Sequence, residues 1–241
     1  MSCFQDILDV ASITIDTLME IGVEDCCFIG SVACRLYEQD EDRDPKVRHT
    51  IESLTNIRML IEHFIQDLDV LCLTTYRGGA EAIKRQLCEE NDNFYTLPAR
   101  NREDHWRVLY WDTGSNDPGF ERIKADILVP GVMDLPNIAP NFITKIQGIP
   151  CAPLHLLLFH KLQAWDERRR SSRPHFRAKI PGDIQDIEDL LHAANRCGLK
   201  LLKWRPYISD SFHEISCGRV QEFIIKYPRY RQLWANLGLE L

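Results

Sequence analysis

Several features that would assign this chain to a special class are missing from its 241 residues. No run of about 18 apolar residues occurs, so we expect no membrane-spanning helix. The first residues lack the basic start and apolar run of a signal peptide. There is no internal repeat and no low-complexity segment. We therefore expect a soluble globular protein of the cytoplasm or the nucleus.

The chain has nine cysteines but no Cys-x-x-Cys pair, which argues against a structural zinc site. The number is odd, and several of these residues lie inside apolar segments. We interpret them as reduced, mostly buried thiols. They are Cys3, Cys26, Cys27, Cys34, Cys72, Cys88, Cys151, Cys197 and Cys217.

The chain lacks an excess of positive charge, because its formal net charge is -7. The whole surface will therefore not attract nucleic acid or anionic membrane, and a polyanionic ligand needs a local basic site. One such segment exists. From Lys161 to Lys179 there are seven positive residues, and only Asp166 and Glu167 oppose them. This segment, and residues 168–179 in particular, fits a triphosphate or an RNA or protein acceptor. A solvated helix end fits it equally well.

Hydrophobic residues make up 44% of the chain, enough for one large domain or two small ones. Strand and helix patterns alternate up to about residue 150, and helical patterns follow. We predict an α+β fold, with a mixed sheet flanked by helices over residues 1–150 and a helical domain over 151–241. Strands are expected at 26–29, 67–73, 106–111, 120–129 and 142–149, and helices at 4–18, 31–37, 51–64, 80–89, 154–165, 183–196 and beyond 211.

Three carboxylates lie in apolar strand patterns: Asp67 and Asp69 in one, Asp126 in another. A carboxylate in a buried strand is costly unless it is paired, hydrogen-bonded or bound to metal. Residues i and i+2 of a strand share a face, so Asp67 and Asp69 project together and repel. Mg²⁺ (or Mn²⁺) is a natural bridge between such oxygen ligands when phosphate completes the shell.

A strand-to-helix turn at Gly30-Ser31 precedes these acids. Glycine lets the backbone approach a phosphate closely, and a helix N-terminus offers free N–H groups. If Asp126 lies beside Asp69, the acids could hold two ions, a clamp for the two oxygens of an in-line displacement. Each piece also has a plain alternative. Gly-Ser could be a simple cap, and Asp126 could pair with Lys124 or Arg122.

The order Gly30-Ser31, Asp67-Leu68-Asp69 and then Asp126 resembles the nucleotidyltransferase superfamily of the polymerase-beta type. The resemblance covers about residues 24–130. It implies that the three acids hold two magnesium ions and that the Gly-Ser helix holds a nucleoside triphosphate. One departure is the long interval before Asp67, where residues 38–64 look like an insertion.

Residues 149–190 resemble more narrowly the AbiEii-like toxins and their minimal nucleotidyltransferase relatives. The resemblance rests on a helix carrying Lys161, a following Arg168, a basic segment and a helix with Asp183 and Asp186. It implies that Lys161 and Arg168 contact the triphosphate, with the two aspartates nearby as a base or an orienting group. Alternatively, Lys161 lies on a solvated face, Asp183 is only an N-cap and Asp186 faces solvent.

The predicted reaction is transfer of a nucleoside monophosphate from an NTP such as ATP to a hydroxyl acceptor on an RNA end, a protein or a small molecule. One alternative is an inactive nucleotide-binding or interaction module with the same fold. Another is a glycosyltransferase that uses Asp-x-Asp with Mn²⁺, which would not need Asp126 beside Asp69. The acceptor, the base preference and the oligomeric state stay open.

Overall fold

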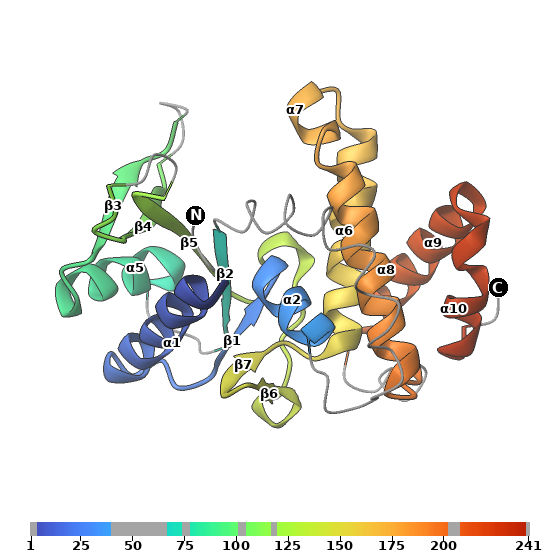
Figure 1. Cartoon of the computed structure of the whole chain (residues 1–241), viewed down its shortest axis with the longest axis horizontal. Helices are drawn as coiled ribbons and strands as arrows, with labels where there is room; N and C mark the ends of the chain where they lie inside the picture. The colour runs from blue at the N-terminus through green and yellow to red at the C-terminus, as the bar shows by residue number, and fades with distance from the viewer. Residues whose placement is uncertain are drawn as a thin grey trace.

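A computed structural model describes residues 4–39, 67–73, 78–100, 105–116, 120–201 and 208–239. Within these ranges a seven-stranded mixed sheet is flanked by helices and followed by a helical C-terminal region, an α+β fold as predicted (Figure 1). The helix expected over 51–64, and all but two residues of the predicted insertion 38–64, lie outside the described residues.

The sheet has the strand order β3-β4-β5-β2-β1-β7-β6. Its central strand β2 runs parallel to β5 and antiparallel to β1, so segments far apart in the sequence become neighbours. Strand β3, which we did not predict, pairs with β4 at one edge. The strands are β1 (Cys26–Ile29), β2 (Asp67–Cys72), β3 (Phe94–Pro98), β4 (Arg107–Asp112), β5 (Arg122–Leu128), β6 (Thr144–Ile146) and β7 (Ile149–Cys151).

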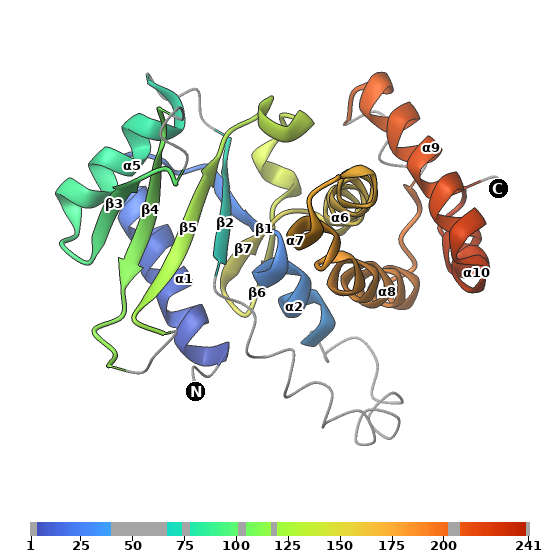
Figure 2. The same cartoon turned by 90° about the horizontal axis from the view of Figure 1, so that it is seen from above.

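Helix α2 lies between the sheet and the C-terminal helices, while α1 and α5 lie together beside the other face (Figure 2). The C-terminal helices α6 and α8 pack against one another, and α9 packs on α6. The helices are α1 (Phe4–Glu20), α2 (Ser31–Gln39), α5 (Gly79–Glu90), α6 (Leu154–Arg170), α7 (Pro174–Arg177), α8 (Ile180–Arg196), α9 (Asp210–Lys226) and α10 (Arg231–Asn236), with short 3-10 turns η5 (Val132–Asp134), η6 (Pro140–Phe142) and η8 (Pro228–Tyr230).

The single strand predicted over 142–149 is wrong. Residues 144–151 form a hairpin of β6 and β7, and Pro150 lies inside β7 instead of closing a strand. The reversal occurs at Gln147 and Gly148, which both have positive φ (51° and 83°). Two successive residues with positive φ are typical of a tight hairpin turn, which a long apolar pattern conceals.

The hydrophobic core runs without a break from the sheet into the C-terminal helices. Helix α6 is buried on nearly every side because α2, α8 and α9 all pack around it. The boundary near residue 150 stays a prediction. The described cysteines form no disulfide with one another, and Cys26, Cys27, Cys34, Cys72 and Cys151 are buried, as expected. In the described ranges no helix has both the length and the hydropathy to cross a bilayer.

Candidate functional site

The three acids meet on two neighbouring strands. In the parallel pairing of β2 with β5, Asp69 lies opposite Asp126 and Asp67 lies opposite Lys124. Burial raises the pKa of Asp69 to about 6, and the charges of Asp126 and Asp67 add to that rise. Asp67, the first residue of β2, is exposed, and partial burial of its carboxylate still raises its pKa, with Asp126 again contributing. The strands therefore place Asp126 beside Asp69, where the carboxylates repel one another.

Gly30 makes room for the carboxylate of Asp69. It follows β1 with a φ of 78°, a left-handed conformation that favours glycine. A Cβ at this position would lie 2.0 Å from Oδ2 of Asp69. The next residue, Ser31, is the first residue of α2. The Gly-Ser turn therefore touches the acid site directly, and its glycine is required by close approach as well as by backbone conformation.

Lys124 already provides a positive charge among the acids. Its ammonium group makes an ion pair with Oδ2 of Asp126, one of the two pairings that the sequence left open. The residue types and strand positions of Asp67, Asp69 and Asp126 fit a hard divalent cation. As the side chains stand, however, no three His, Cys, Asp or Glu residues in the described ranges converge to ligate one ion.

Lys161 forms the second part of the site. It is only 7% exposed, so the solvated-face interpretation is wrong. Its Nζ lies 2.5 Å from Oδ2 of Asp186 and 3.3 Å from Oγ of Ser31. Burial alone would lower the pKa of Lys161, but Cys34 and Asp186 outweigh it, and the net shift is upward. The charge of Lys161 also acts on Asp69, so the two parts of the site adjoin.

Arg168 and Asp183 make an ion pair between α6 and α8. Asp183 is 2% exposed and lies inside the first turn of α8, whose N-cap is Lys179, so its interpretation as an N-cap is wrong. Burial raises the pKa of Asp183, although the hydrogen bond from Arg168 opposes the rise. The second carboxylate oxygen of Asp183 has no hydrogen-bond partner among the described residues.

The basic segment divides into two parts. Arg169 and Arg170 belong to α6, which extends beyond the end predicted at residue 165, and both make ion pairs with Asp166 and Glu222. Further along, the exposed cations are Arg173, Arg177 and Lys179. The charge of Lys179 lowers the pKa of Asp67 against the effect of burial, so Lys179 lies within electrostatic range of the acids.

Three residues near the site were missed as functional candidates: Cys34, Lys124 and Asp189. Burial raises the pKa of Asp189 to about 7, and Glu38 adds to that rise. Burial raises the pKa of the Cys34 thiol, and the nearby charge of Lys161 opposes that rise. The signal for Lys124 was available, since strand alternation puts it on the same face as Asp126. Cys34 and Asp189 depend on helix packing, which local patterns do not report.

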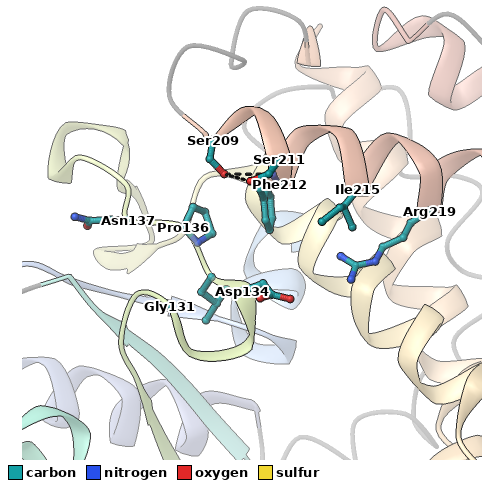
Figure 3. Close-up of a pocket in the computed structure, with 10 residues that line it drawn as sticks. Gly131, Asp134, Pro136, Asn137, Ser209, Ser211, Phe212, Ile215 and Arg219 are labelled. Carbon is teal, nitrogen blue, oxygen red and sulfur yellow. Dashed lines mark hydrogen bonds between the residues drawn. The ribbon is translucent and has the colours of Figure 1, made fainter.

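A separate pocket of about 390 Å³ lies between residues 131–137 and the start of α9. Asp134 and Arg219 extend into it from opposite walls (Figure 3). None of the residues predicted to form the site lines this pocket.

Comparison with known proteins supports the fold described above. The crystal structure of an antigenic nucleotidyltransferase-like protein from Paracoccidioides brasiliensis superposes with a TM-score of 0.59. The match covers 95% of this chain and 92% of that chain, at 14% identity. The chain has a nucleotidyltransferase-like fold. No protein-family model matches the sequence, and no curated protein matches it. The narrower AbiEii-like resemblance stays a prediction.

Proposed function

We propose that this protein is a nucleotidyltransferase that moves a nucleoside monophosphate from an NTP to a hydroxyl acceptor, with pyrophosphate as the leaving group. The observation that carries the proposal is the register of β2 and β5, which sets Asp69 beside Asp126 on one face. A glycosyltransferase that uses Asp-x-Asp alone does not need this third carboxylate, so the register favours the nucleotidyltransferase.

Asp67, Asp69 and Asp126 are the residues that would hold Mg²⁺ or Mn²⁺. Bound there, the cation would polarise the phosphate and lower the pKa of the acceptor hydroxyl. The carboxylates themselves orient the reacting groups, since Asp69 is fixed against Gly30. The raised pKa of Asp69 fits this role, because a group that is costly to ionise alone gains most from a cation.

Ser31 and Lys161 would bind the triphosphate. The first turn of α2 offers free N–H groups, and the ammonium of Lys161 lies within hydrogen-bond distance of the Ser31 hydroxyl. Asp186 holds that ammonium in place at 2.5 Å, so its position is set before the nucleotide arrives. Arg168, expected to contact the triphosphate, is paired with Asp183, and in this proposal its role is to fix α6 against α8.

Lys179 acts on the charge of Asp67, and we expect the exposed cations Arg173, Arg177 and Lys179 to contact an RNA or protein acceptor. Phosphate contacts from such residues position a nucleic acid without reading its sequence. The AbiEii-like character, the cytoplasmic location and the division near residue 150 are parts of the same proposal.

A nucleotide-binding module without turnover is the second candidate. The observation that favours it is the ion pair of Lys124 with Asp126, because it engages one of the three carboxylates. Such a module would bind NTP and release no pyrophosphate.

The test is incubation with each α-labelled NTP, Mg²⁺ and either total RNA or cell lysate, followed by identification of the labelled product. We expect transfer by the wild-type protein and its loss in Asp67→Ala and Asp69→Ala. Asp92→Asn, at an exposed position outside the site, is the control and should transfer normally. Transfer that is unchanged in both alanine variants contradicts the catalytic assignment.

A further inference from the structure

Lys124 occupies the position in this site where a cation is expected. It lies directly opposite Asp67 in the register of β2 with β5, and two residues before Asp126 on the same face of β5. Its ammonium is paired with Asp126, and the charges of Asp67 and Asp69 act on the same group. One lysine side chain therefore balances part of the charge of all three carboxylates.

The ammonium of Lys124 would weaken the binding of a metal ion at this site. An oxygen of Asp126 that is paired with Lys124 is not free to ligate an ion, and two positive charges at one place repel. The side chains of Lys124 and Asp126 are 32% and 35% exposed, so this pair is in contact with solvent and can separate without unfolding the strand. Metal binding and the lysine ion pair are thus alternatives at the same carboxylate.

We propose that Lys124 is a built-in competitor of the divalent cation, a residue that sets the metal affinity of the site by holding Asp126 in an ion pair. The inference rests on the proposed function, because it assumes that the three acids are the metal ligands. It goes further in assigning to Lys124 a positioning role that the sequence did not suggest. In the absence of nucleotide the site binds metal weakly, and removal of the lysine charge strengthens binding.

The experiment measures Mn²⁺ binding to the nucleotide-free protein by electron paramagnetic resonance and calorimetry. Lys124→Met should bind Mn²⁺ about tenfold more tightly than the wild type, since one nearby unit charge shifts an ion equilibrium at least that far near a protein surface. Lys124→Arg keeps the charge and should keep the weak affinity. The matched control is Arg122→Met, which removes a cation two residues away on the same strand face, where Arg122 lies over the ring of Tyr110. Its affinity should stay within about twofold.

Thermal unfolding supplies a second readout that does not depend on turnover. In EDTA, Lys124→Met should unfold at a lower temperature than the wild type because it removes the ion-pair partner of Asp126. Mn²⁺ should raise its unfolding temperature more than that of the wild type. Lys124→Gln repeats the test with a polar side chain if the methionine variant does not fold.

The outcomes separate the two hypotheses. Equal Mn²⁺ affinity in the wild type and both neutral variants, with loss of binding in Asp69→Asn, overturns the role of Lys124 and leaves the metal site intact. Absence of Mn²⁺ binding from every folded variant overturns the proposed function, and this inference with it. If Arg122→Met gains as much Mn²⁺ affinity as Lys124→Met, the effect comes from the net charge of the surface and not from the ion pair, and the inference is overturned.

Discussion

Replacing Gly30 with alanine adds one methyl group where neither the backbone nor Asp69 leaves room for it. At a φ of 78°, a non-glycine residue costs about 1–2 kcal/mol. The added Cβ would lie 2.0 Å from Oδ2 and 2.9 Å from Cγ of Asp69, whereas ordinary contact begins at 3.4 Å. The carboxylate must therefore move by about 1.4 Å, the difference between 3.4 and 2.0 Å.

Gly22→Ala is the matched control for this change. Gly22 has a φ of 82°, nearly the same as Gly30, but a Cβ there would meet nothing within 4 Å. Gly22→Ala should lose about 1–2 kcal/mol of unfolding free energy in urea titrations, and Gly30→Ala should lose more because the clash with Asp69 adds to the same backbone cost. Only Gly30→Ala also displaces Asp69, and a displacement of about 1 Å in a reacting site can reduce turnover by about 100-fold.

The assays are urea unfolding, nucleotide transfer and Mn²⁺ binding on both variants. We expect both variants to fold, with Gly30→Ala the less stable of the two, and transfer and Mn²⁺ affinity lost only in Gly30→Ala. If Gly30→Ala is folded and transfers nucleotide as fast as Gly22→Ala does, the contact between Gly30 and Asp69 has no part in the site, and the reasoning is refuted.

Three further predictions concern the charged groups. The folded state raises the pKa of Asp69 from 3.8 to about 6, so without metal its ionisation destabilises the protein as pH rises through that window. In urea titrations in EDTA, the free energy of unfolding of Asp69→Asn should thus exceed that of the wild type by about 1–3 kcal/mol at pH 7 and by little at pH 4. Lys161→Met should cost about 2 kcal/mol by leaving Asp186 unpaired, and Asp186→Asn in the same chain should recover part of it in thermal melts. Arg168→Met should lower the free energy of unfolding by about 3 kcal/mol, because it leaves the buried Asp183 without its ion-pair partner. Adding Asp183→Asn should restore most of that stability, as measured by urea unfolding followed by circular dichroism. A double variant that is no more stable than Arg168→Met contradicts the pairing.

The acid site was predictable because its signals are local. Strand alternation puts Asp67 and Asp69 on one face, and the order of the elements suggested that Asp126 lies nearby, which the β2–β5 register confirms. The strand-to-helix turn at Gly30-Ser31 was predictable, but its contact with Asp69 was not. Its contact with Asp69 arises from the antiparallel pairing of β1 with β2, which sets Ile29 opposite Asp69.

The second part of the site, around Lys161, was predicted only through resemblance, because its contacts join helices that are distant in the sequence. No local pattern states that Lys161 of α6 reaches Asp186 of α8 and Ser31 of α2. The partner of Asp126 was left open between Lys124 and Arg122, because spacing alone does not distinguish them. The β6–β7 hairpin was missed because Gln147 adopts positive φ, which is uncommon outside Gly, Asn and Asp.

The central claim is that Asp69, together with its neighbouring carboxylates, supports nucleotide transfer. It is tested most directly by pyrophosphate release from an NTP in the presence of Mg²⁺ and an RNA or protein acceptor fraction, compared between the wild type, Asp69→Asn and Asp92→Asn. We predict release by the wild type and Asp92→Asn, and a loss of at least about 100-fold in Asp69→Asn. Equal release by all three proteins, or NTP binding without release by the wild type, would contradict it.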